Sequence, residues 1–208
     1  MGRRNLHSRE ELEDLALKAA AGIVDAGGAG DLTMREVARR IGYTVGALYM
    51  VFANLDDLIV RLNERTVADL ARSFDDVNRK ARTADQRLRL LTAAYLGFAL
   101  LHTNRWRLVF EHRLPEGQRA PPTYRAHTAG IFKLVSDNLR AALPKRAAAN
   151  VDELAIALWA GVHGVCMLAV TGKLQVGGST SVQRLLDVLV GRFVDSAPQR
   201  ARRPRKRA

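Results

Sequence analysis

The chain has 208 residues, of which 48% are hydrophobic and 26% are charged, and its formal net charge is +12. So large an apolar fraction excludes an intrinsically disordered chain, and the single cysteine excludes an intrachain disulfide. The charge is uneven: residues 1–65 carry a net −1, residues 66–196 a net +7, and the tail 197–208 a net +6. The total charge therefore does not mark the N-terminal part as a nucleic-acid surface.

The predicted elements are all helices, and strand signals are absent. Ser8 followed by Glu11 has the spacing of a capping box, and apolar residues then recur at helical spacing as far as Gly27. After four N-terminal helices, further helices are predicted near residues 84–103, 105–112, 122–143, 151–173 and 180–196. Loops are predicted at 114–122 and 177–179, where prolines or glycines cluster.

Two short helices follow the first. Thr33 with Glu36 has the spacing of a second capping box, and Gly42 ends that helix after about two turns. Thr44 caps a third helix extending to residue 52, and Asn54 caps the fourth. Two short helices joined by a tight glycine turn form a helix-turn-helix, whose second helix enters the DNA major groove. A hairpin in an ordinary helical bundle shares this spacing, so the pattern alone leaves both interpretations open.

The residue types in this segment carry a resemblance to a known family. The matching positions are Thr33, Val37, Ala38, Gly42, Thr44, Ala47, Leu48, Tyr49, Phe52 and Leu58. In this order they resemble the signature of the TetR-type (TetR/AcrR) transcriptional regulators. Three positions depart from it: Leu55 stands where the family usually has a phosphate-contacting lysine, Tyr43 replaces a smaller apolar residue, and Val51 replaces His or Tyr.

The resemblance implies an all-α fold with a three-helix DNA-binding domain at residues 8–56. A helical-bundle domain for effector binding and dimerisation would follow at 57–196, and then a disordered basic tail at 197–208. It implies a homodimeric repressor, with a dimer built largely from the last two helices, that leaves its double-stranded operator when a small-molecule effector binds. The single cysteine and the lack of an apolar signal-peptide core in the first residues favour a cytoplasmic protein, and no cofactor is expected. The residues expected to contact DNA are Thr33, Arg35, Thr44, Val45, Gly46, Ala47, Tyr49 and Met50.

Two further segments resemble a subgroup of this family. Residues 159–164, Trp-Ala-Gly-Val-His-Gly, look like its Trp/His/Gly element, and residues 105–110 look like the short helix before it. The resemblance implies an effector pocket among the fifth to eighth helices. Candidate pocket residues are Trp106, Phe110, Phe132, Trp159 and His163. Aromatic residues on buried helical faces are more often plain core, and this interpretation stays open.

Several alternatives remain beside this hypothesis. Residues 154–172 carry no formal charge, which suits a membrane span or a buried helix; His163 and three glycines favour the buried helix. His163 and Cys166 share a helical face, but with no second such cluster a core histidine is favoured over a metal site. The arginine-rich tail either touches DNA non-specifically or is solvated, and we favour the latter.

No nucleophile–base pair and no phosphate-binding glycine loop is recognisable, so no catalytic residue is expected. The alternative function is a helical ligand-binding or enzymatic protein in which the N-terminal hairpin is only structural.

Overall fold

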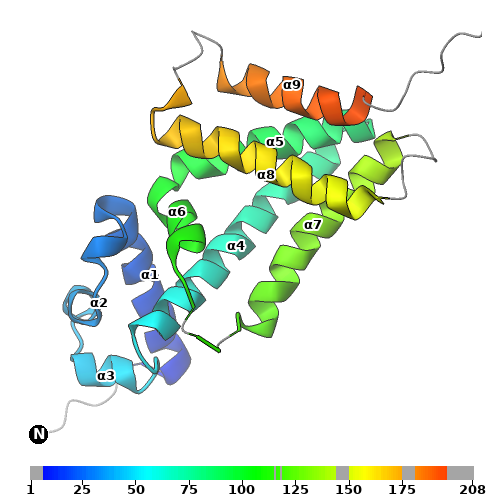
Figure 1. Ribbon diagram of the computed structural model, residues 1–208. Coiled ribbons are helices and arrows are strands. Elements are labelled where there is room, and N and C mark those ends of the chain that lie inside the picture. Colours follow the sequence, from blue (N-terminus) through cyan, green and yellow to red (C-terminus); the bar gives the residue numbers. More distant parts are fainter. Residues whose placement is uncertain (1–6, 115, 118, 144–149, 175–180, 196–208) are drawn as a thin grey trace, which may run out of the picture. The chain divides into compact units, whose positions relative to one another are not determined.

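The computed structural model describes residues 7–114, 116–117, 119–143, 150–174 and 181–195, and every regular element in them is helical (Figure 1). The prediction of an all-α fold with an N-terminal helix-turn-helix is confirmed. The helices are α1 (Arg9–Gly27), η1 (Ala29–Asp31), α2 (Met34–Ile41), α3 (Val45–Tyr49), α4 (Leu55–Lys80), α5 (Ala84–Leu101), α6 (Thr103–Glu111), α7 (Pro122–Ala142), α8 (Val151–Val170) and α9 (Val182–Asp195). The predicted break at 177–179 and the tail 197–208 lie outside the described residues.

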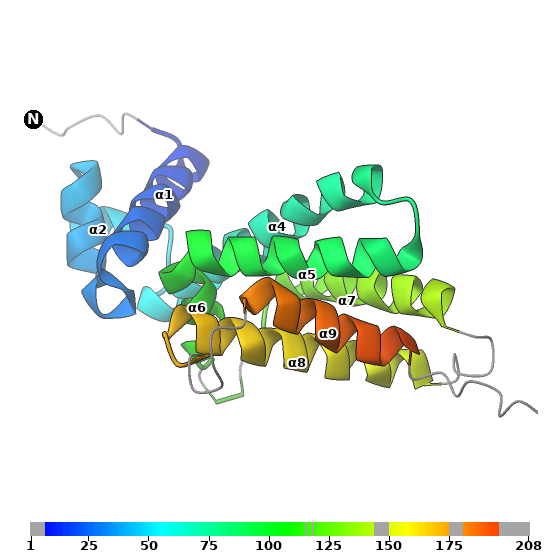
Figure 2. The same cartoon turned by 90° about the horizontal axis from the view of Figure 1, so that it is seen from above.

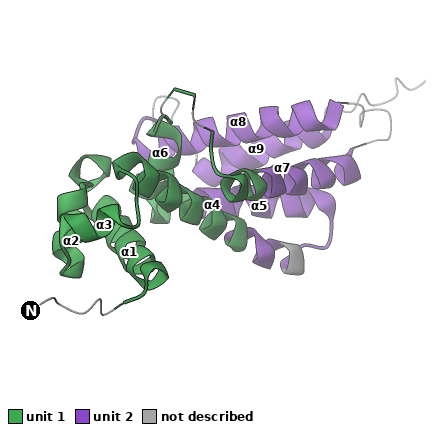
Figure 3. Ribbon diagram, turned by 90° about the horizontal axis from the view of Figure 1, so that it is seen from below, with its two compact units in different colours: residues 1–72, 98–128 green, residues 73–97, 129–208 purple. Residues whose placement is uncertain are grey.

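The chain forms two compact units (Figure 3). The first combines residues 1–72 with 98–128, and the second combines 73–97 with the part that follows 128. Helix α4 contributes its first two thirds to one unit and its end to the other. This grouping is by contacts, and the division at residues 56 and 57 into functional domains stays a prediction.

The first unit is built around α1. The predicted capping box is present: Ser8 Oγ accepts a 3.1 Å hydrogen bond from the Glu11 amide, and the Ser8 amide donates to the Glu11 carboxylate at 2.6 Å. Gly28 ends the helix with a φ of 88°, a conformation that side chains rarely tolerate. The buried face of α1 packs in one cluster with residues from α2, α3, the segment between α3 and α4, and α4: Leu17, Ala20, Val24, Val37, Leu48, Phe52 and Leu58.

The second unit contains most of α5 and of α7, together with α8 and α9, and α8 and α9 run side by side (Figures 1 and 2). Gly161 of α8 faces Leu189 of α9, and a Cβ atom on Gly161 would lie 2.9 Å from a methyl carbon of that leucine. The missing side chain therefore lets α8 and α9 of the same chain approach closely.

Among the described residues, α8 is the one helix long and apolar enough to cross a membrane by length and composition. This is weak evidence, because core helices of soluble proteins pass the same test. Its buried residues Ala155, Leu158, Val162 and Cys166 recur every three or four positions, as expected of a helix with one face on a protein core.

Candidate functional site

The helix-turn-helix consists of α2, a three-residue turn at 42–44 and α3. Gly42 adopts the left-handed conformation, with φ 73° and ψ 27°, and the Tyr43 amide then donates a 3.0 Å bond to the carbonyl of Ala38. Gly42 therefore allows the chain to leave α2 abruptly and to reach Thr44, the cap of α3, two residues later. The Thr44 hydroxyl accepts a 3.2 Å bond from the Ala47 amide, which confirms the predicted cap of α3.

Two local expectations were wrong. The Thr33 hydroxyl caps α2 by accepting from the Glu36 amide at 3.1 Å, but the second half of the capping box is absent. Instead, the Glu36 carboxylate accepts bonds of 2.7 and 2.6 Å from the Arg39 guanidinium, which holds the pKa of Glu36 below its usual value. Helix α3 ends at Tyr49 and not at residue 52, and Val51 and Phe52, which follow its cap, are buried in the core.

The eight residues expected to contact DNA lie in two short segments of the first unit. Tyr49 and Met50, at the end of α3, expose 54% and 72% of their surface. Val45 and Ala47 are half-buried against the core, where they fix the inner side of the helix. The other four are exposed: Thr33, Arg35, Thr44 and Gly46.

Gly46 has no evident internal reason to be glycine. A Cβ atom built on it would meet only the Thr44 hydroxyl, at an ordinary distance of 3.8 Å, and its φ is not positive. The fold would therefore accept alanine there. The missing side chain leaves the outer surface of α3 bare, so that a partner can approach its backbone closely.

The end of α3 is held by an arginine that the sequence reasoning missed. Arg61 of α4 lies over the Phe52 ring at 5.2 Å and contacts carboxylate oxygens of Glu13 at 2.9 Å and of Asp57 at 3.0 Å. The available signal was the i, i+4 pair of Asp57 with Arg61. The contact with Glu13 joins α4 to α1, which holds the helix-turn-helix in place.

The start of α4 is also rigidly capped. Asn54 accepts a 2.9 Å bond from the Asp57 amide, as predicted, and the Asp57 carboxylate accepts one from the Ala53 amide. Leu55 packs against the core at the position where the resemblance would place a lysine. His112, at the end of α6, contacts Asp56 at 3.0 Å and so fixes the same turn from a distant segment.

The five candidate pocket residues form two groups, one in each unit. Trp106 and Phe110 of the first unit stack edge-to-face at 5.5 Å. In the second unit, the Trp159 ring lies 5.4 Å from Phe132 and 5.5 Å from His163. The structure therefore brings Phe132, Trp159 and His163 together, whereas Trp106 and Phe110 form a separate pair.

Tyr95 is a further member of the second group, and sequence reasoning did not single it out. Its hydroxyl lies 2.9 Å from Nδ1 of His163, and burial lowers the pKa of that histidine. The signal was a polar tip on the apolar face of α5 that also carries Leu88, Leu91 and Thr92.

A small cavity of about 40 Å³ lies beside this group. Its wall comes from α4, α5, α7 and α8 and is apolar apart from Thr92 and Tyr95. Trp159 belongs to the wall, but Phe132 and His163 do not.

No group of three His, Cys, Asp or Glu side chains in the described part of the chain is arranged to hold a metal ion. Cys166 is fully buried, and burial raises the pKa of its thiol to about 12. The thiol is therefore protonated near neutral pH and is a poor metal ligand. His163 lies on the same helical face as Cys166, and its Nδ1 contacts the Tyr95 hydroxyl.

Two protein-family models match the chain, one near its N-terminus and one in its C-terminal half. The family model of bacterial regulatory proteins, tetR family, matches residues 16–62, and the model of the tetracyclin repressor-like C-terminal domain matches residues 88–193, about half of the chain. HTH-type transcriptional regulator Rv1816 of Mycobacterium tuberculosis is 31% identical over 113 residues, which are 52% of this chain and 45% of that protein. The matched segment thus spans less than half of that relative's length.

Solved structures resemble the chain over nearly all of its length. A protein with unknown function from Rhodococcus sp. RHA1 has a TM-score of 0.77 at 22% identity, covering 95% of this chain and 100% of that one. The transcriptional regulator FadR from Bacillus subtilis, in complex with stearoyl-CoA, has a TM-score of 0.68 at 12% identity, covering 89% and 99%. At these identities the likeness establishes the fold alone. With two family models matching in order along it, the chain belongs to the tetR family of bacterial regulatory proteins.

Proposed function

We propose that the chain is a homodimeric transcriptional repressor that binds a double-stranded DNA operator and releases it when a small molecule binds. The observation that carries this proposal is the exposed surface of α3, where Gly46 leaves the backbone bare beside Tyr49 and Met50. A slim, rigidly supported helix with such a surface suits the major groove, and the Tyr49 hydroxyl can reach a phosphate.

DNA binding on this proposal depends on aimed contacts more than on charge. Residues 1–65 are nearly neutral, and Glu36 partly neutralises Arg39. Arg35 is exposed, and no ion pair to it is seen within the described residues. Because Leu55 replaces a phosphate-contacting lysine, we expect a salt dependence of binding about one unit of slope shallower than a relative with that lysine.

The homodimer is proposed on the exposed apolar side chains of α8 and α9. Ile156 and Leu168 of α8 expose 55% and 45% of their surface, and Val188 of α9 exposes 54%. Exposed apolar side chains on two neighbouring helices are candidates for a protein interface. A two-fold pairing of these helices would also account for the apolar character of α8 without a membrane. We propose that the protein acts in the cytoplasm as a regulator and not as an enzyme.

The proposed effector site is the small cavity whose wall includes Tyr95 and Trp159. His163 contacts Tyr95, and Phe132 contacts Trp159. The apolar wall of the cavity favours an apolar ligand group, and the Tyr95–His163 hydrogen bond lies beside it. A cavity of about 40 Å³ holds little more than a water molecule, so an effector must enlarge it. An effector that binds the form with the enlarged cavity more tightly shifts the protein toward that form. DNA is released if this form binds the operator less tightly.

Two features support the finer assignments. We assign the effector domain to the Trp/His/Gly subgroup, a proposal supported by the contact between the tilted rings of Trp159 and His163. The structure of Bacillus subtilis FadR in complex with stearoyl-CoA provides an example of a similar fold that binds a molecule with a long acyl chain. Trp106 and Phe110 belong to α6 in the first unit, and we no longer propose that they line the effector pocket. We propose instead that they help to transmit the effector signal.

The test is binding of the purified protein to the DNA that flanks its own gene, measured by fluorescence anisotropy. We expect sequence-specific, salt-sensitive binding that Tyr49→Ala weakens by about tenfold, because it removes one aimed contact. Leu101→Ala is the matched control, since Leu101 is 77% exposed on α5 and should leave binding unchanged.

If Tyr49→Ala bound as tightly as the parent, the assignment of α3 as the recognition helix would be wrong. If the parent bound no DNA even at low salt, a helical ligand-binding protein with a structural hairpin would be the better account. Mass spectrometry of any co-purified small molecule would identify the effector class.

A further inference from the structure

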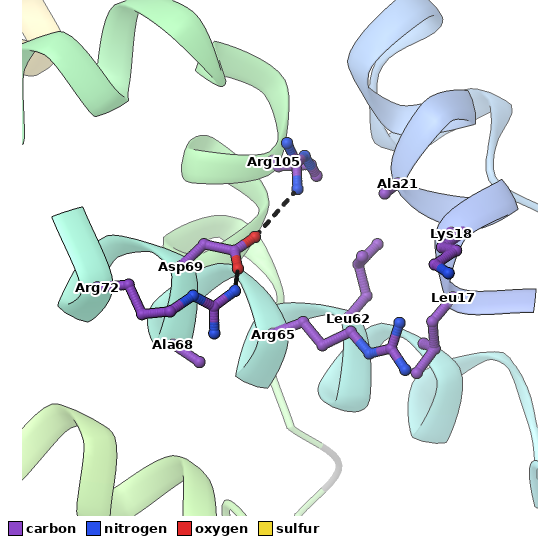
Figure 4. Close-up of a pocket in the computed structure, with 9 residues that line it drawn as sticks. All are labelled: Leu17, Lys18, Ala21, Leu62, Arg65, Ala68, Asp69, Arg72 and Arg105. Carbon is purple, nitrogen blue, oxygen red and sulfur yellow. Dashed lines mark hydrogen bonds and ion pairs between the residues drawn. The ribbon is translucent and has the colours of Figure 1, made fainter. Parts of the chain in front are cut away.

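The first unit contains an open groove of about 330 Å³ lined by α1, α4 and α6 (Figure 4). Its floor is apolar and includes Leu17 and Leu62. Four basic side chains surround this floor: Lys18 from α1, Arg65 and Arg72 from α4, and Arg105 from α6. Three separate helices thus direct positive charge toward one small apolar surface.

One carboxylate lies inside the groove. Figure 4 shows Asp69 between Arg72 and Arg105; it is paired with the first and lies 3.7 Å from the second. Arg105 is largely buried, with 12% of its side chain exposed, and it also contacts Asp25 at 2.8 Å. A nearly buried guanidinium with carboxylates on two helices is held in a fixed orientation.

The other two cations share a carboxylate outside the groove. Asp14 contacts Lys18 at 2.7 Å and Arg65 at 2.9 Å. Across the cluster, three carboxylates therefore serve four cations, and one positive charge remains in excess. Each guanidinium also has more N–H donors than these contacts use, because it carries five.

This charge is local to the groove. An adjoining groove of about 430 Å³ shares Leu17 and Arg65 in its wall, but it is lined by the carboxylates of Glu13, Asp57 and Glu64 against two arginines. The first unit as a whole, residues 1–72 and 98–128, has 15 Lys and Arg and 13 Asp and Glu, a net charge of +2. The basic groove is therefore an arrangement made by the fold and not a sample of a generally basic surface.

We propose that this groove binds a small organic anion, a phosphate or carboxylate group on a compact apolar body. Planar guanidinium groups bind both oxyanions through paired hydrogen bonds, and the floor of Leu17 and Leu62 would cover the apolar part of the ligand. The groove shares no lining residue with the cavity beside Trp159, so it would be a second ligand site, independent of the proposed effector site. A bound anion would contact α1, α4 and α6 together and stabilise this unit against unfolding.

The test is isothermal titration calorimetry of the full chain, without DNA, with inorganic phosphate and with citrate in separate arms. Ionic strength is held constant with chloride. The variant Lys18→Gln/Arg72→Gln removes two cations whose side chains are 71% and 70% exposed, so the fold should persist. The matched control, Arg107→Gln/Lys133→Gln, removes the same charge from two residues that are also paired with neighbouring carboxylates, Glu111 and Asp137.

We expect saturable binding of one anion per chain in at least one arm, weakened about tenfold or more in Lys18→Gln/Arg72→Gln and unchanged in the control. Binding of phosphate alone would assign a phosphate ester, and binding of citrate alone a polycarboxylate. The proposal is overturned if neither anion binds saturably, if the groove variant binds as tightly as the parent, or if the control weakens binding equally.

Discussion

The hydroxyl oxygen of Tyr43 lies 2.6 Å from Nδ1 of His7, so the turn of the helix-turn-helix is joined to the residue that precedes the cap of α1. The two rings also lie near one another, with centroids 6.0 Å apart. Tyr43 is one of the positions at which the sequence departs from the family signature. A larger side chain with a polar tip is explained there by a partner that is 36 residues away.

A double-mutant cycle of His7→Ala and Tyr43→Phe tests this relationship. Both residues lie at the surface, so we expect a coupling free energy of about 0.5–1 kcal/mol, the range of a modest hydrogen bond. Urea unfolding of the parent, the two single variants and the double variant measures it. Strictly additive losses would show that the bond contributes nothing to stability.

The starts of several helices were predictable because the residues that determine them lie within a few positions of each other. Ser8 with Glu11, Thr44 with Ala47, and Asn54 with Asp57 all formed the caps that the spacing predicts. The Thr33–Glu36 box failed for an equally local reason. Arg39, one turn further on, offers the Glu36 carboxylate a charged partner that the neutral backbone amide does not match.

The contacts that shape the candidate sites could not be predicted in this way. Tyr95 and His163 are 68 residues apart, and Arg105 and Asp25 are 80 apart. Helical periodicity shows that each residue lies on an inward or outward face, but it does not show which face it meets. Sequence reasoning therefore grouped Trp106 with Trp159 as aromatic residues, whereas the structure divides them between two units.

Gly46→Ala should separate folding from DNA binding. Alanine is the better helix former, and its Cβ atom meets no close neighbour here, so the free energy of unfolding should rise by about 0.5–1 kcal/mol. The same methyl group lies on the exposed surface of α3, and we expect it to hold the helix back from DNA and weaken operator binding. Denaturant unfolding and anisotropy on the same samples measure the two effects.

Gly97→Ala is the control for this substitution, since Gly97 is exposed on α5 with open space around its Cβ position. It should raise stability similarly and leave DNA binding unchanged. Unaltered operator affinity in Gly46→Ala would mean that close approach to α3 is not required.

His163 should make stability depend on pH in a defined direction. Burial lowers its pKa in the folded protein from the usual value of 6.5, so below that pH the unfolded chain takes up a proton more readily than the folded one. The contribution of this histidine is therefore complete above pH 6.5 and is lost as pH falls toward its folded pKa. Urea unfolding on both sides of pH 6.5 measures this loss.

In His163→Gln this part of the pH dependence should disappear, whereas His127→Gln, at an exposed position of α7, should retain it. If the parent and His163→Gln lost stability in parallel on acidification, the buried environment inferred for His163 would be wrong. Both variants keep Tyr95, whose hydroxyl contacts the His163 ring in the parent, so a difference between them is due to the histidine that was replaced.

Ile156→Glu and Val188→Glu should each break the proposed homodimer. The two side chains are about half exposed in the single chain, at 55% and 54%, so a carboxylate at either position is well solvated in a monomer. In a two-fold interface of α8 and α9, the same carboxylate would be buried beside apolar neighbours without a partner, at a cost of several kcal/mol. Sedimentation velocity should therefore show a folded monomer for each variant and a dimer for the parent.

Leu101→Glu is the control for these variants. It introduces the same charge at a position that is 77% exposed and lies outside α8 and α9, and it should remain dimeric. A dimer in both interface variants would place the contact between protomers on another surface.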